Sequence, residues 1–318
     1  MPVYVVRFEH ESRVRWGVLR GPRIHPLEGS FETTGELVRA HDVESLVVHE
    51  GPSIDVGAVR LLAPVTRNQR FVCQGANYRQ HMIESGLDPD AKSFNMIFTK
   101  ASSCIAPADS DVVMPHRVRL LDYEIELGLV LRRDIRGPLQ VTDDTLHELV
   151  AGAVIVNDYS ARDVQIPQMQ FYKGKSFRTF GPVGPHLALL HRDDFPRLRR
   201  LRLTLRVNGQ VRQDDSTANL VYGPAETLTE LSGVQDFDAG DLLSTGTPAG
   251  CALSVPSPRK QRLAALLPEA TRWKAFFRIQ SQRTQYLRVG DVVESRICSE
   301  DGALDLGVQR NRIVAEAP

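Results

Sequence analysis

Several features are scarce in this 318-residue sequence, and each scarcity excludes a class of protein. The four cysteines are widely spaced and form no C-x-x-C pair, so neither a disulfide framework nor a zinc knuckle is indicated. No apolar run approaches the ~18 residues that a membrane-spanning helix needs. The first residues, MPVYVVRFEHESR, lack the basic, apolar and small-residue order of a signal peptide. We therefore expect a cytoplasmic protein without a membrane partner.

The sequence also carries no net charge, because 39 Lys and Arg residues balance 39 Asp and Glu residues. This balance does not favour nucleic acid or an anionic membrane as a partner, so we expect a small-molecule substrate. The length allows a sizeable core, arranged as one large domain with a small one or as two domains of medium size.

Residues 1–66 have the pattern of a small β-rich unit. VYVVRFEH and RWGVLR are rich in β-branched and aromatic residues and flank a charged turn, which predicts a hairpin. TGELVRAH predicts a helix with Thr34 as a candidate N-cap. The polar stretch TRNQR marks the predicted boundary, so residues 67–318 form the second unit.

The second unit begins with strand, glycine and helix patterns. FVCQGANYRQHMIESGL predicts a short strand and a helix, and MIFTKASSCIAPADSDVVMP predicts a strand, a turn and a strand. LRLTLRVNGQVRQDD predicts a hairpin around Asn208-Gly209, with its Arg side chains on a solvated face. AGDLLSTGTPAG predicts a strand before a Gly-rich turn, which lacks the spacing of a phosphate loop.

The stretch from Leu121 to Arg133, LDYEIELGLVLRR, predicts a strand with Asp122, Glu124 and Glu126 on one face. Its continuously apolar end indicates a covered strand, although an E-x-E pattern also suits a solvated sheet face. Two buried carboxylates about 6 Å apart repel by roughly 3 kcal/mol at an effective dielectric near 20. We expect a buried Lys or Arg, a shared proton or a divalent cation to compensate them.

Other residues can complete such a site. A second covered strand, AGAVIVN, ends just before Asp158, which offers a third carboxylate. His81 and Glu84 share a helix face, as in a surface pair or in a general base whose imidazole a carboxylate orients. Lys173 and Lys175 follow in a glycine-bearing loop, and these two lysines are the alternative to a metal as countercharge.

The motif series GANYRQH, FTK, DYEIELG, NDYSARDVQ, KGKSF, GDLLSTGTPAG, LRVGD and RNRIV, in this order from Phe71 to Val314, resembles the fumarylacetoacetate hydrolase (FAH) family. The resemblance implies an α+β fold that is mostly β, with a mixed β-sandwich roll, a small N-terminal β-rich domain and a homodimer. It also implies that Glu124, Glu126 and Asp158 hold Mg²⁺ or Mn²⁺, and their oxygen ligands also suit Ca²⁺.

Family members hydrolyse carbon–carbon bonds in acylpyruvates and related diketo acids, and we expect this reaction here. His81, oriented by Glu84, would activate a water for attack on the distal carbonyl, and the pyruvate end would leave as an enolate bound to the ion. Lys175 and Gln165 match the family's polar substrate contacts. The alternatives are a decarboxylase or isomerase of a related oxo acid, which needs no activated water, and a non-catalytic binding module.

The remaining candidates for substrate contacts are Gly246 and Thr247 of the Gly-rich turn, with Tyr78, Arg79 and Tyr159.

The sequence departs from the family pattern in three places. Gln74 stands where many members have an acid or a glycine, and Arg178 follows KSF where Asp is frequent. Residues 251–286 are some two dozen longer than the usual link. We expect this insertion to be a surface or dimer-interface elaboration, or else a lid that carries Trp273 or Phe276.

Overall fold

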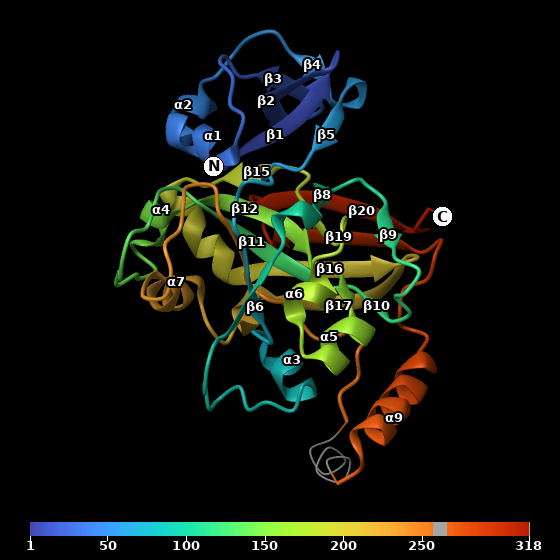
Figure 1. Ribbon diagram of the computed structural model, residues 1–318. Helices are drawn as coiled ribbons and strands as arrows, with labels where there is room; N and C mark the ends of the chain where they lie inside the picture. The colour runs from blue at the N-terminus through green and yellow to red at the C-terminus, as the bar shows by residue number, and fades with distance from the viewer. Residues whose placement is uncertain (257–265, 318) are drawn as a thin grey trace.

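The computed structural model describes residues 1–256 and 266–317. Within these ranges the strands form a 13-strand sheet, a five-strand sheet and a two-strand pair. Figure 1 shows the N-terminal part capping a larger body in which sheets pack on one another. The fold is therefore mostly β, as expected.

The N-terminal part is an antiparallel sheet with two short helices beside it (Figure 1). Its elements are β1 (Val3–His10), β2 (Arg13–Arg20), β3 (Arg23–Pro26), α1 (Thr34–Ala40), α2 (Val43–Val47), β4 (Ile54–Asp55) and β5 (Arg60–Leu62). The predicted hairpin is β1–β2. The predicted N-cap was displaced by one residue: the side chain of Thr33 caps α1, while Thr34 is buried and its hydroxyl donates to the Pro64 carbonyl.

The N-terminal sheet continues into the body of the molecule. β1 pairs with β15 (Leu187–Leu189), which in turn pairs with β12 (Val150–Asn157). One apolar cluster contains side chains of both parts, such as Leu37 and Val154. The two parts therefore share a core, and the division into domains near residue 66 stays a prediction.

The rest of the large sheet carries the acidic stretch. β11 (Ile125–Leu131) lies between β12 and β18 (Leu242–Ser244), followed by β6 (Phe71–Gly75) and β7 (Met96–Lys100). The short strands β8 (Ile105–Pro107) and β14 (Gly181–Val183) pair beside them. Every residue of β11 is buried: the side chains of one face enter one apolar cluster, and Val130 on the other face enters a second cluster.

The second sheet packs against this one. It is built from β17 (Gln210–Ser216), β16 (Leu201–Val207), β19 (Val292–Ser299), β20 (Asp305–Ala315) and β9 (Val112–Met114). β16 lies against β11, and β19 and β20 lie against β12. The β16–β17 hairpin turns at Asn208-Gly209, both with positive φ, as predicted.

Helices surround the sheets. They are α3 (Arg79–Glu84), α4 (Leu146–Leu149), α5 (Arg162–Gln168), α6 (Phe171–Lys175), α7 (Pro224–Ser232) and α9 (Glu269–Ser281), with 3₁₀ turns at Val56–Ala58, Ser102–Cys104, Arg192–Arg200 and Thr217–Asn219. Lys173 and Lys175 thus lie on a short helix rather than in a loop. No helix in the described ranges has the length and apolar character to cross a membrane.

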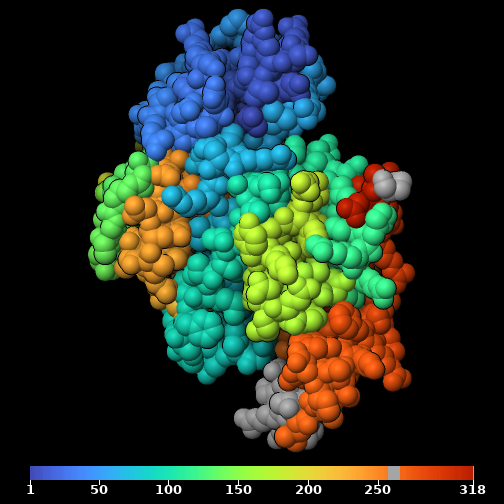
Figure 2. Space-filling model, in the orientation of Figure 1, coloured from blue at the N-terminus to red at the C-terminus, as the bar shows by residue number. Residues whose placement is uncertain are grey.

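The insertion at 251–286 is described except for residues 257–265. Its helix α9 projects from the body, at the lower right of Figures 1 and 2. Phe276 packs against the main core, and the Trp273 indole stacks edge-on against it at 5.8 Å. Leu253, Ser254, Val255, Arg283 and Gln285, at the two ends of the insertion, line a surface pocket.

Candidate active site

The acidic stretch is two strands with a break between them. β10 (Leu121–Asp122) pairs with β13 (Ser160–Ala161), and β11 starts at Ile125. Side chains bind the backbone amides across the break: Asp122 accepts from Tyr123, and Asn157 accepts from Glu124. The single predicted strand is therefore interrupted where polar side chains replace the ladder of backbone hydrogen bonds.

The structure brings Glu124, Glu126 and Asp158 together. Glu124 lies in the break, Glu126 in β11, and Asp158 directly after β12, where its amide donates to the Glu124 carbonyl at 2.8 Å. All three are buried, and they offer carboxylate oxygens within 4.8 Å of one another.

Two buried lysines bind these acids. Lys175 Nζ donates to Glu124 and, at 2.6 Å, to Asp158. Lys100, at the end of β7, donates to Asp158 at 2.5 Å and to the Phe180 carbonyl at 2.8 Å. Of the two lysines proposed from the sequence, Lys175 is present, whereas Lys173 is exposed and donates to Gln168 at 3.1 Å.

Arg162 is the third cation, at the start of α5. Its guanidinium donates to Glu124 at 2.5 Å, to Asp122 at 2.8 Å and to the Gln165 amide oxygen at 2.8 Å. Sequence reasoning missed Arg162 and Lys100, although both lie inside motifs of the family series, SARD and FTK. In the structure Gln165 orients this arginine.

The buried charges balance if Glu126 carries a proton. Three cations form ion pairs with three carboxylates other than that of Glu126. The cations are Lys100, Lys175 and Arg162, and the carboxylates are those of Asp122, Glu124 and Asp158. Glu126 has no ion pair within the described residues and accepts from the Ser244 hydroxyl at 2.5 Å and the Gly246 amide at 3.1 Å. Burial, with repulsion from Asp158 and Glu124, raises the pKa of Glu126 to about 8.

Glu124 and Lys175 keep their charges in this cluster. Burial alone would raise the pKa of Glu124, but attraction to Arg162 and Lys175 lowers it well below its usual range. Burial alone would lower the pKa of Lys175, but Asp158 and Glu124 raise it. Buried cations, one of the three compensations expected from the sequence, therefore act together with a proton that neutralises one acid, Glu126.

The three carboxylates also fit a divalent ion. All their donors are hard oxygens, which Mg²⁺, Mn²⁺ and Ca²⁺ prefer. The ammonium of Lys175 already lies between Glu124 and Asp158, so the site accommodates a cation there. When Glu126 is ionised the cluster carries one net negative charge, and a divalent ion would change this to one positive charge, which suits an anionic keto acid.

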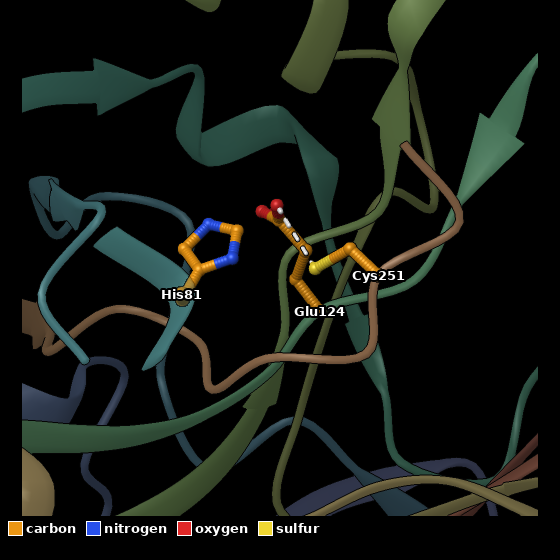
Figure 3. Close-up of side chains that lie close together, drawn as sticks. All are labelled: His81, Glu124 and Cys251. Carbon is orange, nitrogen blue, oxygen red and sulfur yellow. Dashed lines mark hydrogen bonds between the residues drawn. The ribbon is translucent and has the colours of Figure 1, made fainter. Parts of the chain in front are cut away.

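His81 lies at the edge of this cluster, on α3. Figure 3 shows its imidazole facing Glu124 and Cys251. Burial lowers the pKa of His81, so the ring is neutral at physiological pH, and its Nδ1 atom is buried without a hydrogen-bond partner among the described residues. The expected hydrogen bond to Glu84 is not formed: Glu84 is exposed and accepts from Gln80 at 3.4 Å. Residues three apart differ by about 60° around a helix, so Glu84 points to the rim.

The remaining predicted substrate contacts are the two residues of the Gly-rich turn and three aromatic or arginine residues. The Gly246 amide and the Thr247 hydroxyl hold the acidic strand, the first through Glu126 and the second by donating to the Ile125 carbonyl at 2.9 Å. At Gly246, with φ of +89°, a Cβ would lie 2.9 Å from Asn77, so the turn requires glycine.

The two tyrosines predicted to contact substrate are buried in the core, and the predicted arginine lies at the surface. Tyr159 is fully buried in the core and donates to Asn311 at 3.3 Å. Tyr78 is also fully buried, and its hydroxyl has no partner in the described residues. Arg79 is exposed and pairs with Asp90 at 2.5 Å, which turns its guanidinium to solvent.

An open pocket of about 570 Å³ adjoins Cys251. Its lining includes Tyr123, Glu84 and two arginines, Arg212 and Arg283. Neither arginine pairs with a carboxylate of the described residues; Arg212 Nε is buried without a partner, and Arg283 donates to the Ala252 carbonyl at 2.7 Å. Sequence reasoning assigned Arg212 to a solvated sheet face and did not single out Arg283.

Comparisons with known proteins agree on the relationship. The family model described as fumarylacetoacetate (FAA) hydrolase C-terminal matches residues 70–314, and one described as Rv2993c-like, N-terminal matches residues 5–64. The oxaloacetate tautomerase YisK of Bacillus subtilis is 34% identical over 63% of this chain and 66% of that protein. The human mitochondrial oxaloacetate tautomerase FAHD2A is 36% identical over 63% of this chain and 62% of that protein.

Solved structures extend the likeness to the whole chain. Fumarylacetoacetate hydrolase from psychrophilic Exiguobacterium antarcticum has a TM-score of 0.74 and 29% identity, covering 99% of this chain and all of that one. A probable 2-hydroxyhepta-2,4-diene-1,7-dioate isomerase from Mycobacterium abscessus has a TM-score of 0.74 and 26% identity, covering both chains fully. The matched residues span less than two thirds of each of the two tautomerases above.

Lys100→Met should destabilise the metal-free protein by about 3–5 kcal/mol, because it leaves one buried carboxylate without compensation. Denaturant unfolding in EDTA measures this loss. Lys173→Met is the matched control, since Lys173 is exposed and contacts none of the acids. Equal effects of the two substitutions would contradict the charge balance described above.

Glu126→Gln should change how stability depends on pH. The pKa of Glu126 is raised in the folded chain, so the native state keeps a proton that the unfolded chain loses above about pH 4.5. The metal-free wild type should therefore lose stability as the pH rises from about 4.5 to about 8, and the variant should lose less. Melting curves in EDTA across this range, with exposed Glu28→Gln as control, test the difference; parallel slopes would refute it.

Proposed function

The chain belongs to the fumarylacetoacetate hydrolase family, and from this premise we propose that it interconverts the keto and enol forms of a small oxo-dicarboxylic acid of the oxaloacetate type. We also propose that it requires Mg²⁺ or Mn²⁺ held by Glu124, Glu126 and Asp158. The tautomerases named above, at 34% and 36% identity, support this reaction.

The observation that carries the choice is the state of His81. Hydrolysis needs a base that holds and activates a water, and the carboxylate expected to orient that base, Glu84, faces solvent. Tautomerisation needs only a group that moves one proton between carbon and oxygen. His81 is a neutral imidazole with an unpartnered Nδ1 at the edge of the cluster, which suits that task.

In the keto-to-enol direction, His81 accepts a proton from the carbon next to the ketone, and the protonated imidazole then donates this proton to the ketone oxygen. The reverse steps return the enol to the ketone. A divalent ion, when bound, would polarise the ketone and acidify the neighbouring carbon. The protonated ammoniums of Lys175 and Lys100 contribute positive potential where negative charge develops on oxygen.

The pocket beside Cys251 supports a substrate with a second carboxylate. Arg212 and Arg283 line it without carboxylate partners among the described residues. Guanidinium groups bind carboxylates through paired N–H donors, and such charge-assisted hydrogen bonds are roughly twice as strong as neutral ones. We assign these arginines to the distal carboxylate.

Carbon–carbon hydrolysis of an acylpyruvate is the second candidate. It is favoured by the likeness to the Exiguobacterium antarcticum hydrolase and by the presence of His81 and Glu84 on one short helix. Pyruvate release from several acylpyruvates, measured beside tautomerisation, separates the two reactions.

The purified chain with Mn²⁺ should accelerate the decay of enol oxaloacetate absorbance, and EDTA should abolish the effect. His81→Asn should lower the rate by about 100-fold or more, because a general acid–base group typically contributes 10²–10⁴-fold. Exposed His116→Asn is the matched control and should keep the rate. Faster acylpyruvate cleavage than tautomerisation, or full tautomerase activity in His81→Asn, would overturn this assignment.

Arg212→Gln and Arg283→Gln should each raise KM for oxaloacetate by about ten- to a hundredfold, since a hydrogen bond to a charged group contributes ≈ 1.5–3 kcal/mol. The KM for a monocarboxylic substrate such as enol phenylpyruvate should change little. Arg202→Gln, which alters an exposed pair with Asp214 on the same hairpin, is the control. An equal rise for both substrates would exclude a distal-carboxylate role.

A further inference from the structure

A second group of metal-ligating side chains lies beside the three carboxylates. His81, Glu124 and Cys251 come from α3, from the break before β11 and from the insertion, and they converge in Figure 3. We propose that these three residues bind a thiophilic divalent cation of the Zn²⁺ class, in addition to the hard-ion site of the carboxylates. This proposal can be tested independently of the reaction proposed above, because occupancy of the site can be measured without turnover.

The geometry is close to that of a zinc site. The three residues each offer one ligand atom, and these atoms lie within 4.8 Å of one another. The Cys251 thiol donates to Glu124 Oε1 at 3.9 Å. Tetrahedral zinc, with sulfur at about 2.3 Å and nitrogen or oxygen at about 2.0–2.2 Å, places its ligand atoms about 3.5 Å apart. Side-chain adjustments of about an ångström therefore complete the site.

One candidate ligand atom, Nδ1 of His81, lacks a hydrogen-bond partner among the described residues. His81 Nδ1 is buried and makes no hydrogen bond within residues 1–256 and 266–317, and an unsatisfied buried polar atom requires an explanation. The ring faces Glu124 and Cys251, so a cation between the three would satisfy this atom.

The chemistry of the three ligand atoms determines which ion this site prefers. Imidazole nitrogen and thiolate sulfur bind Zn²⁺ well, whereas Mg²⁺ and Ca²⁺ take oxygen ligands. One thiolate and one carboxylate neutralise a divalent charge. Arg162 would keep its bonds to Asp122 and Gln165 if Glu124 turned toward this ion.

An ion can reach this site from solvent, and one of its coordination positions is open to a water molecule. Cys251 lines the 570 Å³ pocket, which gives an entry path and room for a water as fourth ligand. Glu124 belongs to both ion sites, so occupancy by Zn²⁺ should compete with Mg²⁺ or Mn²⁺. Zinc would thereby inhibit an enzyme that needs the hard ion.

Titration of the full-length metal-free chain with Co²⁺ tests the proposal, because Co²⁺ replaces zinc and shows a near-ultraviolet charge-transfer band when a thiolate binds it. We expect the band in the wild type and its loss in Cys251→Ser. Cys298→Ser is the matched control, since Cys298 lies on β19, and it should keep the band. Zn²⁺ added after Co²⁺ should remove the band.

Two further variants separate this site from the carboxylate site and from misfolding. Glu126→Gln should keep the thiolate band while losing Mn²⁺ binding by calorimetry, and Cys251→Ser should keep Mn²⁺ binding, which reports an intact fold. If Cys251→Ser does not fold, His81→Asn should still weaken Zn²⁺ binding by at least about tenfold. A featureless Co²⁺ spectrum, a band that survives in Cys251→Ser, or unchanged Zn²⁺ affinity in His81→Asn would overturn the proposal.

Discussion

The structure depends on burying four carboxylates, those of Asp122, Glu124, Glu126 and Asp158, in one small volume. An uncompensated buried charge costs several kcal/mol, so each acid must meet a cation, a proton or a metal ion. The fold supplies cations from three separate elements: the end of β7, the start of α5 and the end of α6. This requirement explains why such distant segments converge, and it prepares a pocket that gains positive charge when an ion binds.

The sequence predicted the acids better than their partners. Alternation along a strand and the position of Asp158 after a covered strand are local patterns, so they could be read directly. Lys100 pairs with an acid 58 positions away, and such a contact leaves no periodic signal. Helical spacing placed Glu84 near His81 but could not say which side chain would face inward. The chain belongs to its family through motifs that contain these residues, yet the motifs alone did not assign their contacts.

The Gly-rich turn supports the acidic strand, and the substrate contacts predicted for Gly246 and Thr247 stay a prediction. It forms no phosphate loop; its amide and hydroxyl groups hold Glu126 and the Ile125 carbonyl, so it braces the acidic strand from the neighbouring strand β18. The insertion contributes to the pocket through its two ends rather than through its helix, because Cys251 and Arg283 line the pocket.

The pairing of β1 with β15 has a consequence for synthesis on the ribosome. Val3 lies opposite Leu189, so the first strand to emerge waits for a partner that is translated after more than half of the chain. At 5–20 residues per second this delay lasts about 10 to 40 s. During that time the part of β1 from Val3 to Val5 lacks its strand partner on this edge and is open to pairing with other chains, whereas β5 covers the part from Arg7 to Glu9.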